Sequence, residues 1–400
     1  MERLLHFKIM RRKIGIYLGT DPHAGGTFQY DLTILEALAT LSPSEYAVTA
    51  IYTDALWERF LDAGFRKLFV SRRFADRLTG AVCVKTRLSV SWLRSHASRL
   101  YSAARAIAAE DCDLWIFPSQ DTLSYQIPVP SLAVIHDLMH RYERRFPEVS
   151  AHGEYERRER HYERVCRWSQ GILVDSEVGK RQVVESYGVA PDKIHVLPYA
   201  PPRYLKQANK GPDTEKIPEK FIFYPAQFWS HKNHKNLLLA LSWLRIEKGL
   251  EINLVLAGSM KNSYQATRAL VEKLGLSKSV FFLGYVPNET IVQLYRRARA
   301  LVMPTFFGPT NIPPLEAFAS GCPVATSGIY GTPEQVGEAA LLFDPTSVED
   351  IAQQVAKLWT DDDLCRYLAE RGRRRAEQFS RASFNARFEA ILGRIVGELP

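Results

Sequence analysis

The sequence predicts an α/β protein with two doubly wound domains, each built on a parallel sheet, that face each other across a cleft. Three observations support this prediction. Short apolar runs alternate with helical patterns along most of the chain. One polar stretch interrupts the alternation near the middle, and a second alternation of the same kind follows it. The length of 400 residues is enough for two domains that each have a core.

The first domain is expected to span residues 1–202. It begins with a buried strand at 12–18, a Gly-rich loop from Gly19 to Gly26 and a helix with regularly spaced leucines. A strand, a glycine turn and a helix in this order are typical of the start of a doubly wound fold. Its later strands are expected at 46–52, 114–117, 132–135, 171–174 and 194–197.

Residues 203–220 are expected to form a linker, because the apolar pattern there gives way to Pro, Lys, Asn, Gly, Asp and Glu. The second domain is expected to span 221–381 and to open as the first does. The amphipathic helix expected at 382–400 either stays with the second domain or crosses back to the first. The elements of the second domain are expected to be a strand at 221–224, a polar turn at 225–236, a helix at 237–244 and strands at 253–257, 280–283, 300–303, 323–326 and 340–343.

The composition excludes several other classes of protein. With 46% hydrophobic and 24% charged residues, and with 23 Gly and 22 Pro spread along the chain, the sequence is not that of a disordered, collagen-like or coiled-coil protein. No apolar run reaches the ~18 uncharged residues of a membrane-spanning helix, and the first residues lack the core of a signal peptide. We therefore expect a cytoplasmic protein, either free or peripheral at the inner face of the membrane.

Neither a disulfide framework nor a metal site is expected. The five cysteines are odd in number and form no C-x-x-C pair. Asp111-Cys112-Asp113 has the spacing of a metal-binding D-x-D motif, but it directly precedes the strand at 114–117, where short acidic residues commonly cap or turn the chain.

Positive charge is concentrated between Arg59 and Arg105, which contains eleven Lys or Arg against two acidic residues. Apolar residues are interleaved with these charges, as in a surface that meets anionic lipid headgroups or a pyrophosphate-bearing acceptor. The alternative is a basic face that is only solvated. Nucleic acid is not expected as a partner, because no nucleic-acid-binding signature accompanies the charge. The candidate contact residues in this stretch are Arg66, Lys67, Arg72 and Arg73.

The loops that follow the first strand of each domain are candidate anion sites. Gly25 and Gly26 follow the strand at 12–18 and open a helix, so the backbone there can approach an anionic group closely. The equivalent loop of the second domain, 227–236, carries Lys232, which can bind a diphosphate at the head of the next helix. The histidines of that loop, His231 and His234, are expected to be solvated or to cap the helix.

The segment 306–324 is the most specific part of the sequence. It predicts a loop after the strand at 300–303 and a short helix that starts near Pro313 and ends at Gly321. We expect the helix start to present three bare amides to an anion, and Glu316 to accept hydrogen bonds from a ribose diol. Residues 301–350 contain no Lys or Arg, so Lys232 must supply positive charge to a diphosphate bound there. The three amides are those of Thr310, Asn311 and Ile312.

In the first domain, His136 lies at the end of the strand expected at 132–135, facing the cleft. A histidine there can bond a hydroxyl of the substrate or the transferred group. The alternative is a structural histidine whose hydrogen bonds are satisfied within the protein.

Taken together, these segments resemble retaining glycosyltransferases of family 4, which have the GT-B fold. The resemblance implies that residues 1–202 bind the acceptor and residues 221–381 the nucleotide-sugar, either GDP-mannose or a UDP-sugar. It implies that Lys232 holds the donor diphosphate, Glu316 the ribose and His136 the transferred sugar. The segments that carry it are Gly25-Gly26, His136-Asp137-Leu138, Leu173-Val174-Asp175-Ser176-Glu177, Lys193-Ile194-His195-Val196-Leu197-Pro198, the Lys232 loop, Leu256-Ala257-Gly258, Leu283-Gly284-Tyr285-Val286 and Pro313-Pro314-Leu315-Glu316-Ala317.

The resemblance further implies a reaction without a metal, in which the leaving diphosphate accepts the proton of the acceptor hydroxyl. The acceptor would be a saccharide or a lipid-linked saccharide, and polysaccharide and O-antigen mannosyltransferases carry segments similar to 306–324. The implied catalytic residues are His136, Lys232 and Glu316. The implied donor-binding residues are Gly25, Gly26, Gln227, Lys232, Gly258, Val286, Thr310, Asn311, Ile312 and Glu316.

Four positions depart from the family pattern. Gly308 stands where the family usually has the first glutamate of a pair, and Gln227 stands where it usually has a phosphate-binding arginine. Thr310-Asn311 replaces the usual Phe-Gly. These departures leave a second hypothesis open, namely a catalytically silent GT-B domain that binds saccharide or assists assembly.

Overall fold

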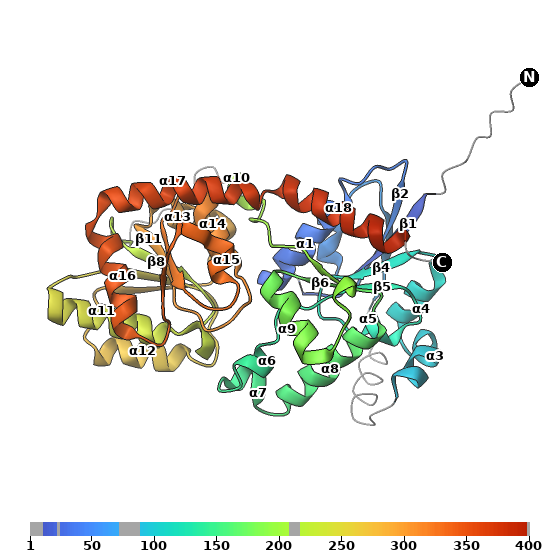
Figure 1. Ribbon diagram of the computed structural model, residues 1–400, viewed down its shortest axis with the longest axis horizontal. Helices are drawn as coiled ribbons and strands as arrows, with labels where there is room; N and C mark the ends of the chain where they lie inside the picture. Colours follow the sequence, from blue (N-terminus) through green and yellow to red (C-terminus); the bar gives the residue numbers. More distant parts are fainter. Residues whose placement is uncertain (1–10, 22–24, 72–88, 208–216, 398–400) are drawn as a thin grey trace, which may run out of the picture.

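The computed structural model describes residues 11–21, 25–71, 89–207 and 217–397. The chain forms two α/β lobes, each with a parallel sheet between helices, as Figure 1 shows. The predicted fold class is confirmed: one sheet has seven strands, the other has six, and every described strand pair is parallel.

The N-terminal sheet has the order β3-β2-β1-β4-β5-β6-β7. Most of its strands are apolar and buried on both faces, as a parallel sheet covered by helices requires. β3 is different, because it is an exposed edge strand whose residues Arg66 and Lys67 face solvent, and it is not among the strands expected from the sequence. The strands are β1 (Arg12–Leu18), β2 (Tyr46–Tyr52), β3 (Arg66–Phe69), β4 (Leu114–Phe117), β5 (Ser131–Val134), β6 (Gly171–Val174) and β7 (Ile194–Val196).

Alternate residues of β1 serve opposite faces of this sheet. Ile14 and Ile16 join the core on one face, whereas Tyr17 packs with Trp115 in the core on the other. Gly15 makes room for Trp115, because a Cβ at position 15 would lie 2.4 Å from its indole ring. The helical elements of this lobe are α1 (Gly26–Leu38), η1 (Ala55–Phe60), α3 (Val90–Leu100), α4 (Ser102–Ala109), α5 (Leu123–Gln126), α6 (Met139–Tyr142), α7 (Pro147–Ser150), α8 (Glu154–Trp168), α9 (Glu177–Tyr187) and η2 (Pro191–Lys193).

The C-terminal sheet has the order β10-β9-β8-β11-β12-β13. Its strands are β8 (Ile222–Pro225), β9 (Leu254–Ala257), β10 (Val280–Gly284), β11 (Ala300–Met303), β12 (Val324–Ser327) and β13 (Leu341–Phe343). The helical elements that follow the first lobe are α10 (Tyr204–Gln207), η3 (Ser230–Lys232), α11 (His234–Lys248), α12 (Tyr264–Lys273), α13 (Asn288–Arg297), α14 (Ile312–Ser320), α15 (Thr332–Val336), η4 (Gly337–Ala339), α16 (Val348–Thr360), α17 (Asp362–Gln378) and α18 (Arg381–Gly397).

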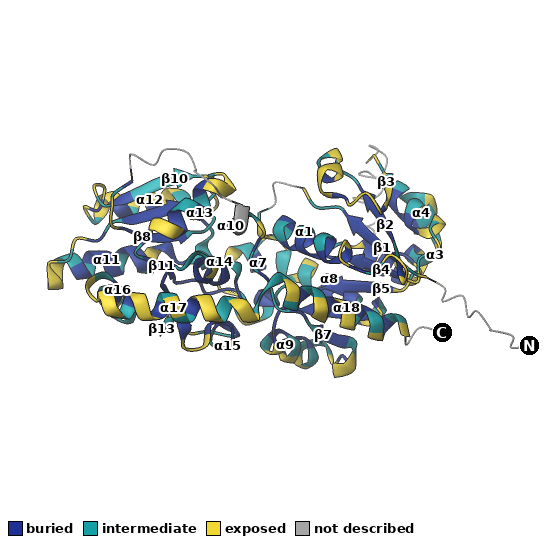
Figure 2. Cartoon of the chain, turned by 90° about the horizontal axis from the view of Figure 1, so that it is seen from above, coloured by how far each residue is buried: buried dark blue, intermediate teal, exposed yellow. Residues whose placement is uncertain are grey.

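The last helix, α18, crosses back to the N-terminal lobe. In Figure 1, α17 lies on the lobe of β8, and α18 continues onto the lobe of β1. Arg381 at the start of α18 donates a 2.8 Å hydrogen bond to Thr33 on α1 and pairs with Glu36. Four apolar side chains of α18 are buried in the N-terminal core: Phe384, Phe388, Leu392 and Ile395. Figure 2 shows that α17, the helix before it, is exposed along much of its length.

Each sheet reverses its strand order once, between β1 and β4 in the first lobe and between β8 and β11 in the second. In open parallel sheets, ligands bind beyond the carboxyl ends of the strands at such a reversal. No helix in the described part of the chain combines the length and the apolar character needed to cross a membrane.

Candidate active site between the lobes

The loop after β8 is held rigidly on the neighbouring loop after β11. The carbonyl of His231 accepts a 2.8 Å hydrogen bond from the amide of Phe306, and the two rings of His231 and Phe307 stack with centroids 3.8 Å apart. Asn233, which has a left-handed backbone with φ of 58°, donates its side-chain amide to Pro304 and Pro345 carbonyls. The two reversal-point loops of this lobe therefore form one unit.

Lys232 sits in the centre of this unit. Its amide donates to the carbonyl of Trp229 at 3.0 Å, and its carbonyl accepts a 2.9 Å hydrogen bond from the Tyr224 hydroxyl. Burial lowers the pKa of Lys232 to about 8, although the carboxylates of Asp137 and Glu148 favour its charged form. Both carboxylates belong to the N-terminal lobe, so negative charges of one lobe favour the protonated form of a lysine in the other.

His136 and Asp137 follow β5 on the N-terminal side of the cleft. Nδ1 of His136 lies 3.2 Å from the Tyr199 hydroxyl, and its Nε2 is buried without a hydrogen-bond partner in the described structure. Burial lowers the pKa of His136 to about 4, so the ring is neutral at pH 7. Burial alone would raise the pKa of Asp137, but the Arg158 guanidinium and the Met139 amide hold it below its usual range. A neutral His136 with one open ring nitrogen can bond a substrate hydroxyl.

The start of α14 differs from the prediction of bare amides. The Thr310 amide donates a 2.9 Å hydrogen bond to Asp175, whose same oxygen also accepts the Thr310 hydroxyl. The amide of Asn311 donates to the Gln335 side chain at 3.1 Å. A carboxylate of the N-terminal lobe therefore takes the position expected for a bound anion, and burial raises its pKa to about 6. Ile312 begins α14, and Gly321 ends it in the left-handed conformation, as predicted.

Glu316 is also engaged, contrary to the expectation that its oxygens are open to a ribose. One carboxylate oxygen accepts a 2.8 Å hydrogen bond from the Tyr295 hydroxyl, and the other accepts the hydroxyl of Tyr204. The side chain is buried, which raises its pKa. Tyr204 lies on α10, in the segment expected to be a linker, so a ribose at Glu316 requires that this hydroxyl move away.

Gly308 is required by the shape of its loop. Its φ is 101°, and a Cβ there would lie 2.6 Å from the Thr310 carbonyl oxygen and 2.7 Å from Nδ2 of Asn311. That Nδ2 donates to the carbonyl of Phe307 and closes the loop. The absence of a glutamate at this position thus follows from a tight turn, which no residue with a side chain can adopt without displacement.

The remaining donor-binding candidates are spread around the cleft. Gly25 has a φ of 67° and ends the first loop. A Cβ on Gly25 would lie 3.5 Å from Nε2 of Gln227, so these two candidates face each other across the lobes. Gly26 begins α1 and has no such neighbour within 4 Å. Gly258 packs directly on the backbone of Ala226, where a Cβ would meet the carbonyl oxygen at 2.2 Å. Val286 is partly buried against the C-terminal core.

The two loop histidines are buried, and the expectation that they are solvated or cap a helix was wrong. His234 is 3% exposed, stacks on Phe228 and has no hydrogen bond from either ring nitrogen in the described structure. His231 donates its ring Nδ1–H to Glu148 at 2.6 Å. Glu148, on α7 of the N-terminal lobe, was not identified from the sequence. The one signal in the sequence that could have pointed to it is its position, eleven residues after Asp137.

The basic candidates Arg66 and Lys67 lie on β3, the edge strand of the N-terminal sheet, which Figure 2 shows away from the other lobe. Arg66 pairs with Glu110 at 3.0 Å, and Nζ of Lys67 donates to the carbonyl of Leu61. Arg72 and Arg73 lie outside the described residues. Phe69, next to this pair, is 53% exposed.

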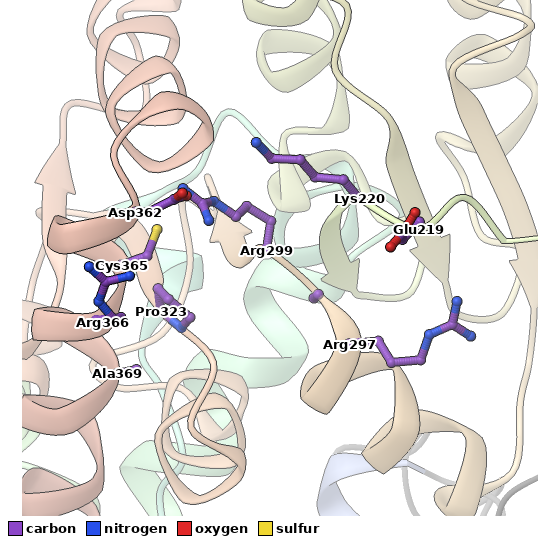
Figure 3. Close-up of a pocket in the computed structure, with 10 residues that line it drawn as sticks. Glu219, Lys220, Arg297, Arg299, Pro323, Asp362, Cys365, Arg366 and Ala369 are labelled. Carbon is purple, nitrogen blue, oxygen red and sulfur yellow. The ribbon is translucent and has the colours of Figure 1, made fainter.

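A cavity of about 560 Å³ lies on the far side of the C-terminal lobe, at the amino ends of β8, β11 and β12 (Figure 3). Its cations are paired within the protein: Arg299 pairs with Asp362 at 2.6 Å, and Lys220 donates to the Trp359 carbonyl. It therefore does not belong to the candidate site. A smaller cavity of about 200 Å³ borders the bond between Asp175 and Thr310. Across the described residues, no three His, Cys, Asp or Glu side chains group as metal ligands.

Comparison with known proteins shows what the chain is similar to. Residues 206–375 match the family model described as Glycosyl transferases group 1. The chain is 28% identical over 218 residues to O-antigen chain mannosyltransferase B of Escherichia coli, across 52% of this chain and 56% of that protein. It is 27% identical over 240 residues to the MMP alpha-(1->4)-mannosyltransferase of Mycolicibacterium hassiacum, across 59% of this chain and 57% of that protein. The chain thus spans little more than half the length of these relatives.

Solved structures match almost the whole chain. Anabaena HepE in complex with UDP and glucose superimposes with a TM-score of 0.71, at 15% identity, over 96% of this chain and 100% of that one. A glycosyltransferase from Rickettsia africae superimposes with a TM-score of 0.68, at 15% identity, over 97% of this chain and 100% of that one. These likenesses show the GT-B fold, and the resemblance to GT-B glycosyltransferases, with mannosyltransferases among the relatives, is confirmed.

Proposed function

Because residues 206–375 form a glycosyl transferases group 1 domain within a GT-B fold, we propose that the chain is a retaining glycosyltransferase of family 4. It moves a hexose, with mannose favoured, from GDP-mannose or a UDP-sugar to a hydroxyl of a saccharide or lipid-linked acceptor in cell-surface polysaccharide synthesis. The O-antigen and MMP mannosyltransferases among its relatives support mannose. The observation that carries the proposal is the Lys232 loop, locked to the loop after β11 and close to Asp137, the residue after His136.

In this proposal the residues of the cleft stabilise the leaving diphosphate. Lys232 supplies its positive charge, and the amides at the start of α14 supply further donors once Asp175 has moved away. One such preorganised donor contributes about 2.7–4 kcal/mol to transition-state stabilisation. The acceptor oxygen forms its bond to the sugar carbon as the bond to the diphosphate breaks, and the proton of the acceptor passes to a diphosphate oxygen. His136 orients the sugar, and no metal takes part.

A second candidate function is a catalytically silent GT-B domain that binds saccharide. Two observations favour it: Gly308 leaves no carboxylate at the first family position, and Tyr204 occupies Glu316. This alternative predicts saccharide binding without turnover of any nucleotide-sugar.

A panel of nucleotide-sugars separates the two functions. The chain is mixed with GDP-mannose, UDP-sugars and dTDP-sugars, and thermal shift and nucleotide release are measured with and without EDTA. We expect one donor to stabilise the chain, by about 2.7 kcal/mol at 100-fold its dissociation constant, and to be turned over in EDTA. Lys232→Ala and Glu316→Ala should abolish most of this turnover. A chain that neither binds nor hydrolyses any donor is not this enzyme.

A further inference from the structure

The side chain of Glu148 lies on the N-terminal lobe but accepts three hydrogen bonds from the C-terminal lobe. Oε1 accepts the backbone amide of His231 at 2.9 Å and its ring Nδ1–H at 2.6 Å. Oε2 accepts the side-chain amide of Asn262 at 3.0 Å. Asn262 in turn accepts the amide of Ser230 at 3.0 Å, so the cluster holds two consecutive residues before Lys232. These bonds exist only when the two lobes are together.

The peptide of His231 is therefore held on both of its sides. Glu148 bonds its N–H from one lobe, and the amide of Phe306 bonds its C=O from within the other. Because the next residue is Lys232, fixing this peptide fixes the direction in which the lysine leaves the loop. No second contact from the N-terminal lobe grips the loop backbone in the described hydrogen bonds.

The surroundings make this carboxylate effective. Its side chain is 7% exposed, and the ring of His231 that it bonds is 11% exposed. Phe146, two residues before it, packs on Phe306 and Phe307 and closes the cluster against water. Burial opposes the ionisation of Glu148, but the hydrogen bonds from His231 outweigh it and lower its pKa to about 2. Because the carboxylate is ionised and can only accept, the histidine is the donor.

We propose that Glu148 is a positioning residue that couples closure of the two lobes to the placement of Lys232 against the donor diphosphate. This inference rests on the proposed function and adds to it a residue that acts only in the closed form. When the lobes separate, the loop loses its bond at His231, and Lys232 loses the charges of Asp137 and Glu148 at the same time. Lys232 is thereby placed for catalysis only when the two lobes are together.

Glu143 provides a matched control for this proposal. It also bonds across the lobes, by accepting the Tyr330 hydroxyl at 2.8 Å, but it does not touch the Lys232 loop. With Glu148→Gln, we expect kcat/KM for the donor to fall about 10- to 100-fold, as for a lost hydrogen bond to a charged group, against less than about threefold with Glu143→Gln. Asn262→Asp, which sets a second carboxylate against Glu148, should resemble Glu148→Gln. Equal losses in the Glu148 and Glu143 variants would overturn the proposal.

The pH dependence of kcat/KM distinguishes this role from that of a residue that only holds the two lobes together, because such a residue would not change it. The titratable groups that face Lys232 are the carboxylates of Asp137 after β5 and Glu148 on α7 and the rings of His231 and His234 in its own loop, which burial keeps neutral. Glu148→Gln removes one of the two carboxylates that favour the ammonium, so the alkaline limb of kcat/KM should move to lower pH. Glu143→Gln should leave the limb where it is. An unmoved limb in Glu148→Gln contradicts the proposal.

Small-angle X-ray scattering separates a failure of this inference from a failure of the proposed function. If the parent chain turns over no donor, the proposed function is overturned. The role of Glu148 in closure of the lobes is then tested by scattering alone. We expect a larger radius of gyration for Glu148→Gln than for Glu143→Gln, because the replaced carboxylate accepts three bonds from the other lobe at position 148 and one at position 143. Equal radii for the two variants would overturn the role in closure, whatever the activity of the parent.

Discussion

The charge of Lys232 depends on groups from both lobes. Burial lowers its pKa to about 8, and the carboxylates that counter this effect, Asp137 and Glu148, are supplied by the other lobe. A lysine with this pKa is a cation at neutral pH and loses its charge within the range of ordinary assay buffers. Its residue type is clear from the sequence, but its ionisation is a property of the closed structure.

Donor affinity is expected to weaken as the pH rises through about 8, because only the protonated Lys232 attracts a diphosphate. Lys232→Arg keeps its positive charge at every accessible pH. Whatever its donor affinity, that affinity should therefore not fall as the pH rises through about 8. Lys232→Ala should bind the donor about 10- to 100-fold more weakly at pH 7. Isothermal titration between pH 6.5 and 9.5 measures all three, and a limb that persists in Lys232→Arg would assign the effect to another group.

Asp31 is a buried carboxyl that the proposed reaction does not use. Its side chain is fully buried on α1, one oxygen accepts the Ser119 hydroxyl at 2.6 Å, and the other has no partner in the described structure. Burial raises its pKa to about 7. A raised carboxyl pKa stabilises the fold below the unfolded value near 4, and this stabilisation is lost as the pH rises through about 7.

Asp31→Asn removes this titration and tests it. The melting temperature of the variant relative to the parent should rise between pH 5 and pH 8, by at least about 2 °C. The unpaired amide of the new asparagine costs stability at every pH, so only the change with pH carries the prediction. Differential scanning fluorimetry at the two values measures it, and a constant offset would contradict it.

At the scale of elements, the turn before α14 sets the chemistry of its helix start. Gly308 adopts a φ of 101°, which lets Asn311 bond back to Phe307 and brings Thr310 to Asp175. This turn presents the Thr310 amide to the N-terminal lobe, whereas the Asn311 amide stays within its own lobe. The same turn has no room for a side chain, so the family glutamate and this loop shape exclude each other.

Gly308→Ala should destabilise the chain by about 1–3 kcal/mol, the range for a strained backbone, and should weaken donor binding because the helix start moves. Gly397→Ala, at the end of α18 where a Cβ meets no atom within 4 Å, is the matched control and should have little effect. Chemical denaturation measures the stability, and titration measures the affinity. If Gly308→Ala is as stable as the control, the loop has freedom that its geometry does not suggest.

At the scale of the whole molecule, the two lobes are joined by contacts of two kinds. α18 connects the lobes by burying four apolar side chains in the N-terminal core. The bonds from Asp175, Glu148 and Glu143 to the other lobe are polar and can be exchanged for bonds to ligands or water. This division suits a chain that opens and closes about a fixed helix.

The outer face of the N-terminal lobe carries Arg66, Lys67 and exposed Phe69 on β3, near the exposed Phe60 of η1. If this face binds anionic membranes, flotation with phosphatidylglycerol vesicles should capture the chain at low salt and less of it at high salt. Arg66→Glu with Lys67→Glu should reduce capture by more than about tenfold, since each cation near a surface contributes about 1 kcal/mol. The control is Arg366→Glu with Arg374→Glu on α17, which makes the same change of charge on another face and should be captured like the parent chain. Equal capture of both variants would show a face that is only solvated.

By itself, the sequence determined the two α/β units, most strand positions and the short helix that starts near Pro313 and ends at Gly321, because burial on both faces and turn residues leave a local pattern. It did not reveal β3, since an exposed edge strand has no apolar run. Only the tertiary structure decided the partners within the site. Glu148 and His231 are 83 residues apart, Tyr204 and Glu316 are 112 apart, and Asp175 and Thr310 are 135 apart. Such bonds depend on how two lobes meet, and no spacing along the chain records that.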